Sequence, residues 1–199
     1  MADITLRDVT VRFDTVVAVD GATLRIDEGE FMVLVRASGC GKTTTLRAIA
    51  GLEQLVGGDI VLGAECVLSA THGIDLAPAK RRAGMVFQNY ALYPYMTVAE
   101  NVAFPLPTRR WPREQIPLAI DEALATVDLV GLGERRPVEL SGGQRQRVAI
   151  ERALVSKRDV LLFDESLSNV DATLRANLRA DLKRLHCRIG ATTCMSPTI

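Results

Sequence analysis

The sequence predicts an α/β fold with a mostly parallel sheet, an antiparallel β region at its start and an inserted helical region. The first thirty residues alternate apolar and polar side chains, as half-buried antiparallel strands do. Short apolar runs at 31–35, 84–88 and 160–163 are typical of strands, and the last of them suits a central parallel strand covered on both faces. Between 116 and 127, apolar residues recur at helical spacing.

The apolar run at 31–35 leads into the segment RASGCGKTTT and then into a helical pattern that Gly51 closes. A strand, a loop with Gly-Lys-Thr and a helix form the context of a phosphate-binding loop, or P-loop. The loop N–H groups and the helix N-terminus would bind an anion. Lys42 would reach the β- and γ-phosphates, and the Thr43 hydroxyl would bind Mg²⁺. Considered alone, the motif could also be a chance Gly-Lys-Thr in a turn.

The predicted nucleotide-binding residues of this loop follow one another along the chain. They are Ser38, Gly39, Cys40, Gly41, Lys42, Thr43 and Thr44.

The composition indicates a chain with a substantial core and no strong charge. It has 199 residues, 48% of them hydrophobic, and its formal net charge is zero. Zero net charge gives no support for nucleic-acid binding. The four cysteines have no C-x-x-C spacing, so neither zinc nor a disulfide framework is indicated. No apolar run has the length of a membrane span and no secretory signal is visible, so a cytosolic, soluble chain is the default prediction.

From Tyr90 to about Glu139 the sequence pattern changes. Prolines recur in this segment before a helical pattern of apolar residues begins. We predict a small helical subdomain there, inserted between strands of one domain that spans 1–199. After it, Ser141 and two glycines open a further helix in the segment LSGGQRQRVAI. The apolar run at 160–163 then ends in Asp164 and Glu165.

Four features therefore stand in a fixed order: the phosphate loop, Gln88 in VFQNYALYP, the segment LSGGQRQRVAI, and LLFDESLSNVDATLR. Together they resemble the ATP-binding subunit of ABC transporters, most closely the importer type that serves sugars, glycerol phosphate and related solutes. The resemblance covers nearly the whole chain, to about Thr193. It implies a P-loop NTPase core and an ATPase that uses ATP and Mg²⁺ and is coupled to transport.

The resemblance also implies catalytic and metal-binding roles. Asp164 would hold Mg²⁺ directly or through water, together with Thr43. Glu165 would be the general base that polarises the attacking water, and its apolar strand could raise its pKa. Gln88 would contact Mg²⁺ or the water and report the nucleotide state; considered alone, it could be an ordinary surface residue.

Further roles concern the nucleotide and a second chain. Phe13 matches the aromatic residue that stacks on adenine, although in an alternating strand it could equally belong to the core. The anion site at the helix start would close over the γ-phosphate bound to a second subunit. Asp171 resembles a loop aspartate that crosses this dimer, and its role as a helix cap is at least as well supported. The helix-start site comprises Ser141, Gly142, Gly143 and Gln144.

The implied partners are a second ATP-binding subunit, as a homodimer or heterodimer, and transmembrane permease subunits. The permease would contact the segment from Tyr90 to Tyr95 and the proline-rich helical region, unless this is an ordinary solvated subdomain. The implied location is the cytoplasmic face of the inner (plasma) membrane, as a peripheral protein. A soluble relative that acts on nucleic acid or ribosomes is an alternative that the importer-like Gln88 segment disfavours.

The sequence departs from the family pattern at several positions. Arg36 replaces the first loop glycine, Glu151 replaces a small residue and Ser166 replaces the usual proline. The family places a switch histidine at the end of the strand after the last helix, but here no histidine follows His186. The β-rich regulatory domain usual in importers is also absent before Ile199. These departures fit a truncated product, although a functional short form is the alternative, and we expect the chain to hydrolyse ATP poorly or not at all. The alternative function is a degenerate subunit that binds nucleotide or a partner without significant hydrolysis.

Overall fold

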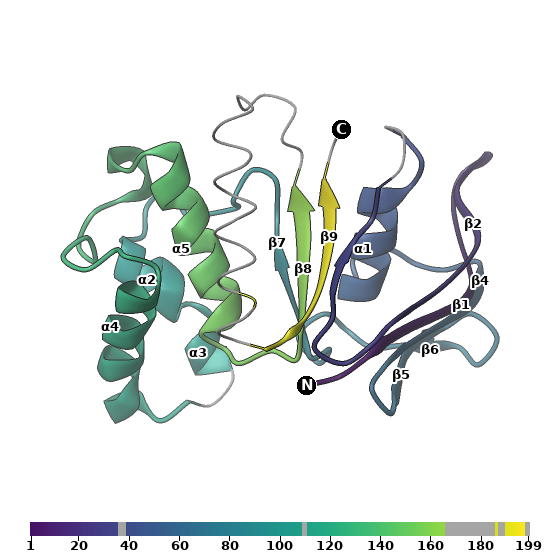
Figure 1. The fold of residues 1–199 in the computed structure, drawn as a ribbon, viewed down its shortest axis with the longest axis horizontal. Helices are drawn as coiled ribbons and strands as arrows, with labels where there is room; N and C mark the ends of the chain where they lie inside the picture. The colour runs from purple at the N-terminus through teal and green to yellow at the C-terminus, as the bar shows by residue number, and fades with distance from the viewer. Residues whose placement is uncertain (36–38, 109–110, 166–185, 187–189, 198–199) are drawn as a thin grey trace. The chain divides into compact units, whose positions relative to one another are not determined.

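The computed structural model describes residues 1–35, 39–108, 111–165, 186 and 190–197, and the chain divides into two compact units (Figure 1). The first unit comprises Met1–Met85 and Arg158–Ile199, and the second comprises Val86–Lys157. The helical region predicted at about 90–139 falls within the second unit, which also includes the helix after Ser141. No helix in the described ranges is long and apolar enough to cross a bilayer.

The first unit holds two sheets and one described long helix, α1. The antiparallel sheet has the order β2-β1-β4-β5-β6, and the other has the order β3-β9-β8-β7. The strands of the first sheet are β1 (Ile4–Phe13), β2 (Val16–Ile26), β4 (Gly57–Leu62), β5 (Glu65–Ser69) and β6 (Ile74–Asp75). Those of the second are β3 (Phe31–Val33), β7 (Ala83–Val86), β8 (Val160–Glu165) and β9 (Thr192–Pro197). The predicted α/β class is confirmed.

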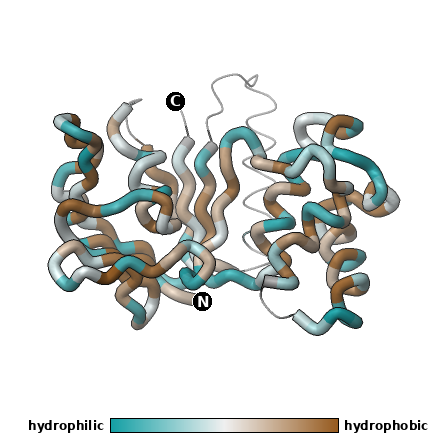
Figure 2. The backbone as a smooth tube through the Cα atoms, turned by 180° about the vertical axis from the view of Figure 1, so that it is seen from behind, coloured by the Kyte–Doolittle hydropathy of each residue, from teal (hydrophilic) through white to brown (hydrophobic). Residues whose placement is uncertain are grey.

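The core of the first unit joins both sheets to α1 (Lys42–Ala50). Hydrophobic residues recur along the strands of both sheets, as the brown stretches of the backbone tube in Figure 2 show. Strand β8 pairs in parallel with β9 and has β7 on its other side, so it lies inside the sheet, as its continuous apolar run predicts. Leu162 of β8 and Cys194 of β9 are fully buried in the same core cluster as Leu46 and Ile49 of α1.

The strand predicted at 31–35 is shorter and more exposed than expected. Strand β3 covers only Phe31–Val33, and the side chain of Val35 is 60% exposed. Among the described strands, β3 pairs with β9 alone and forms the edge of its sheet. The apolar run therefore lies beside one neighbour rather than between two, and the prediction of a buried strand was wrong at its end.

A buried arginine closes the C-terminal end of α1. Arg81 is fully buried, and its Nη1 donates to the carbonyl oxygens of Ala48 at 2.7 Å and Ile49 at 3.0 Å. Its Nη2 donates to Asp75 Oδ1 at 3.1 Å. Burial lowers the pKa of Arg81, while the Asp75 carboxylate acts in the opposite direction. A cation on the last carbonyls of a helix is favourable both as a donor and through the helix dipole.

The second unit is helical and has its own core. Its elements are α2 (Val98–Ala103), α3 (Pro105–Thr108), the 3₁₀ turn η1 (Arg113–Gln115), α4 (Ile116–Thr126), the 3₁₀ turn η2 (Pro137–Glu139) and α5 (Gly142–Leu154). Leu124 of α4, Val102 of α2 and Val148 of α5 meet in this core. The helix predicted from the spacing of apolar residues at 116–127 is confirmed as α4.

Two side chains fix the loop that precedes α2. Tyr90 and Ala91 both have positive φ, 60° and 47°, which is unusual outside glycine. Arg152 of α5 donates to the carbonyl oxygens of both, at 3.0 Å and 2.7 Å, and lies over the ring of Tyr93. Asn101, which is fully buried, accepts from the Tyr93 amide and donates to its carbonyl. The loop is therefore held from within its own unit.

We predict that Arg81→Met lowers the free energy of unfolding by about 2–4 kcal/mol, because buried carbonyls that lose a donor cost about 1–3 kcal/mol each. Urea denaturation of both proteins at one pH measures this change. The control is Arg12→Met, at an exposed position on β1, with an expected change below about 0.5 kcal/mol. Equal effects of the two substitutions would contradict the proposed capping role.

Candidate functional site

The phosphate loop leads directly into α1 in a conformation that depends on glycine. Gly39 and Gly41 have φ of 81° and 79°, in the left-handed region. Gly41 is the N-cap of α1, and no side chain caps this end. A Cβ atom on Gly41 would overlap the carbonyl oxygen of Ala18 on β2, whereas one on Gly39 would meet nothing within 4 Å. Glycine is therefore required at position 41 both for its positive φ and for the close approach of the loop backbone to the backbone of β2.

The start of α1 meets the end of β8 through one hydrogen bond. The Thr43 hydroxyl donates to Asp164 Oδ1 at 2.7 Å. Asp164 is only 7% exposed, at the carboxyl end of its strand. Figure 1 shows that the arrowheads of β8 and β9 lie at the same end of the first unit as the start of α1. The fold thus brings together two residues that are 121 positions apart in sequence.

A cavity of about 200 Å³ lies at this junction. Its lining combines the loop, the first turn of α1, and one residue each from β2 and β9. The lining residues are Ala18, Gly39, Cys40, Gly41, Lys42, Thr43, Thr44 and Ser196. Backbone N–H groups at a helix N-terminus and an adjacent lysine favour an anion such as phosphate. A larger cavity of about 630 Å³, lined mainly by β2 and residues 33–35, shares Ala18, Gly39, Cys40 and Lys42 with it.

The Thr43–Asp164 pair fits a Mg²⁺ ion better than a transition metal. Both residues offer oxygen atoms, which Mg²⁺ prefers, and it typically takes one or two protein ligands with waters and phosphate oxygens. No group of three or more His, Cys, Asp or Glu side chains forms a metal cluster within the described part of the chain. In the structure the Thr43 hydroxyl and the carboxylate bond to each other, so each has a partner before any ion arrives.

Several predicted residues lie partly or wholly outside the described residues. Ser38 and Arg36 fall in the undescribed part of the loop, and Asp171 and Ser166 fall in 166–185. Glu165 is the last residue of β8, directly after Asp164, and only its backbone is described. The roles predicted for these side chains stay predictions.

Other predicted residues belong to the second unit. Gln88 is exposed in the turn after β7. Ser141 caps α5: its hydroxyl accepts from the Gln144 amide at 3.3 Å, and Gln144 Oε1 accepts from the Ser141 amide at 2.9 Å. Cβ atoms on Gly142 and Gly143 would meet nothing within 4 Å. This helix start is therefore preformed, and the packing of the described residues does not require its glycines.

Phe13 lies at the end of β1 and its side chain is 44% exposed. It is consequently not a core residue, which removes one of the two interpretations of its place in the alternating strand. Neighbouring Val16 and Val17 are also exposed, at 64% and 49%. Phe13 is absent from the described lining of either cavity, so its contact with a base stays a prediction.

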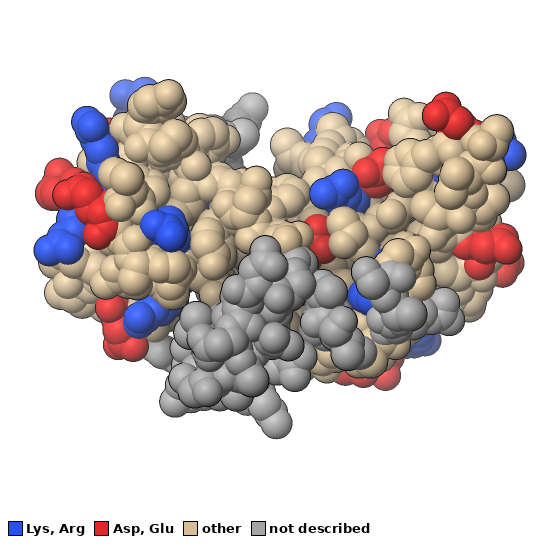
Figure 3. Space-filling model, turned by 90° about the horizontal axis from the view of Figure 1, so that it is seen from above, with Lys and Arg blue, Asp and Glu red and all other residues tan. Residues whose placement is uncertain are grey.

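Sequence reasoning missed two residues that line the small cavity, Ala18 and Ser196. Neither belongs to a recognisable motif, because each reaches the cavity through strand pairing rather than through a local pattern. On the face that Figure 3 shows, acidic and basic side chains are scattered, so this view adds no further signal from charge.

Comparison with known proteins gives a consistent result. The family described as ABC transporter matches residues 19–168. The trehalose/maltose import ATP-binding protein MalK of Thermococcus litoralis is 51% identical over 97% of this chain and 52% of its own length. The sn-glycerol-3-phosphate import ATP-binding protein UgpC of Ralstonia nicotianae is 47% identical over 97% of this chain and 51% of its own length. The chain thus spans about half the length of these relatives.

Solved structures agree with the sequence relatives. The dimeric structure of a bacterial ABC transporter cassette superposes with a TM-score of 0.81 at 29% identity, over 98% of this chain and 88% of that one. A second structure of the same cassette, in a post-hydrolysis state bound to ADP and Pi, gives a TM-score of 0.78 at 28% identity.

We predict that Gly41→Ala destabilises the protein more than Gly39→Ala. Both substitutions place alanine at a left-handed φ, which costs about 1–2 kcal/mol. Only Gly41→Ala also forces β2 away from the loop, adding about 1–3 kcal/mol of overpacking strain. Thermal or urea unfolding of the two variants measures the difference. Equal destabilisation would show that the approach of Ala18 to Gly41 does not constrain the loop.

Proposed function

This chain belongs to the ABC transporter family, and we propose that it is an ATP-binding subunit that hydrolyses ATP to energise a membrane importer. The observation that carries the proposal is the small cavity in which the phosphate loop, the start of α1 and the Thr43–Asp164 pair converge. This arrangement combines an anion site with oxygen ligands for a divalent ion, which is what a nucleoside triphosphate with Mg²⁺ requires.

We propose that the phosphates of ATP occupy this cavity. Backbone N–H groups from Gly39 to Thr44 would bind the phosphate oxygens, and Lys42 would add a positive charge. Thr43 and Asp164 would hold Mg²⁺, which when bound neutralises charge that develops on the phosphates. Ser38 would belong to the same cradle, and Phe13, exposed at the end of β1, would stack on the adenine.

Hydrolysis requires that a water molecule be activated and held in line with the γ-phosphate. We assign the general base to Glu165, because it directly follows the metal-binding Asp164 at the end of β8. Gln88 would contribute to positioning the water or the Mg²⁺. Positioning and charge stabilisation supply most of the catalysis in such reactions.

The transported solute is proposed by analogy with the relatives. Their names specify import of trehalose/maltose and of sn-glycerol-3-phosphate, and a further relative from Rhizobium radiobacter is a lactose transport protein. We propose a sugar or a related solute for the system served by this chain. Its permease subunits would place the chain at the cytoplasmic face of the plasma membrane as a peripheral subunit.

We also propose that two such subunits enclose ATP between them. The start of α5 supports this, since the Ser141–Gln144 capping box is formed while Gly142 and Gly143 leave space above the helix end. A γ-phosphate held by a second chain could approach these backbone N–H groups closely. The partner could be a second copy or a related subunit.

We predict that the purified chain releases phosphate from ATP in a Mg²⁺-dependent manner and that Thr43→Val and Glu165→Gln each lower the rate at least about 100-fold. Thr43→Val removes a metal ligand, and Glu165→Gln removes the base. A single-turnover assay suits the slow hydrolysis expected from Arg36. Thr126→Val, on helix α4 of the second unit, is the matched control. Tight ATP binding without any phosphate release would instead identify a non-hydrolysing subunit.

We predict that Glu165→Gln, which binds ATP but cannot hydrolyse it, forms a dimer with Mg-ATP and is monomeric with Mg-ADP. The physical reason is that the α5 site lacks its anion until a γ-phosphate is supplied by another chain. Multi-angle light scattering measures the mass in each nucleotide. Adding Ser141→Arg should abolish the dimer by filling the helix end. The same mass in both nucleotides would contradict pairing through this site.

A further inference from the structure

Strand register places Ser196 beside Asp164, the proposed metal ligand. Strands β8 and β9 are parallel, with Leu162 paired to Cys194 and Asp164 paired to Ser196. Register partners in a sheet point to the same face, and so do residues two apart along a strand. Leu162 and Cys194 both pack in the core that contains α1. Asp164 and Ser196 therefore also face α1, as the bond from Thr43 to Asp164 shows for the carboxylate.

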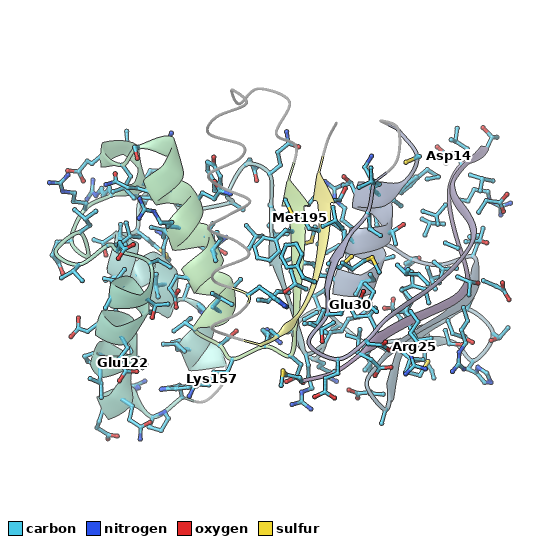
Figure 4. The ribbon with its side chains drawn as sticks, in the orientation of Figure 1. Asp14, Arg25, Glu30, Glu122, Lys157 and Met195 are labelled. Atoms are coloured by element: carbon cyan, nitrogen blue, oxygen red, sulfur yellow. The ribbon has the colours of Figure 1, made fainter. Side chains whose placement is uncertain are left out.

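Ser196 also lines the small cavity. Among the described residues that line this cavity, only Ala18 and Ser196 lie outside the loop and α1. Of these two, Ser196 has the polar side chain. It is 4% exposed, so its hydroxyl is largely shielded from bulk water. Figure 4 labels its neighbour Met195, which lies on the same strand with its side chain on the other face of the sheet.

We propose that the Ser196 hydroxyl donates a hydrogen bond to the γ-phosphate of the bound nucleotide and so favours a nucleoside triphosphate over a diphosphate. The inference rests on the proposed function. Thr43 and Asp164 would hold Mg²⁺, which when bound would neutralise charge on the terminal phosphates, so these phosphates would lie close to Asp164. Neighbouring strands lie about 4.8 Å apart, so a group bound beside Asp164 is within reach of a hydroxyl on β9. The loop and the first turn of α1 line the rest of this cavity, so Ser196 would add one donor from β9 to those that the loop, Lys42 and a second chain would supply to the γ-phosphate.

The test compares Ser196→Thr with Ser196→Val, two β-branched side chains of the same shape that differ in the hydroxyl. ATP and ADP affinities are measured for each by calorimetry with Mg²⁺. We expect Ser196→Val to weaken ATP binding about tenfold or more while ADP changes by less than about twofold, since a hydrogen bond to a charged group is a strong one. Ser196→Thr should bind both nucleotides nearly as the parent chain does.

Two outcomes overturn the proposal: Ser196→Val leaves ATP affinity unchanged, or it weakens ATP and ADP equally. Met195→Leu is the control for a buried change on β9, and it should alter neither affinity. Ser196→Ala adds no atoms and repeats the measurement if the larger side chains prevent folding. A parent chain that binds no ATP refutes the proposed function and this inference together. ATP binding that Lys42→Ala abolishes and Ser196→Val spares refutes this inference alone.

Discussion

The guanidinium of Arg81 holds the end of α1, and the position of the site depends on this helix. A buried cation needs several partners to offset the loss of water, and Arg81 finds them in Leu76, Asp75 and the last carbonyls of α1. Gly51 permits the contact, because a Cβ atom there would lie 2.7 Å from Arg81 Nε. Since α1 is only nine residues long, a shift at this end would also move its first turn.

At its other end, α1 is fixed by contacts of a different kind. Gly41 touches the backbone of β2, and Thr43 bonds to Asp164 on β8. Both sheets of the first unit therefore contact the same helical turn. The small cavity is what remains between them, and its dimensions follow from how closely these backbones approach. Regular elements beside the loop help to hold a phosphate chain and a metal in one geometry.

The sequence allowed prediction of those parts whose signal is local. The strand-loop-helix pattern predicted α1 and its closing Gly51, the apolar run at 160–163 predicted β8, and Ser141 predicted the start of α5. The family resemblance is confirmed by the relatives and the solved structures. Residue pairs that depend on strand register or on tertiary contact could not be predicted. Ser196 meets Asp164 only because β9 pairs with β8, and Arg81 reaches α1 across 33 positions. The partial exposure of β3 and its place at the edge of its sheet could not be predicted either, because an apolar run does not reveal strand order.

The loop from Tyr90 to Met96 has a consequence for association. Its two left-handed residues are stabilised by Arg152, and its middle is stabilised by Asn101, so its backbone is ordered by hydrogen bonds within the second unit. Tyr95, at 89% exposure, projects from this ordered backbone. Association through such a surface would cost less loop entropy than association through a loop without these hydrogen bonds, because part of the ordering is already in place. A preordered surface of this kind favours a partner whose shape already fits it.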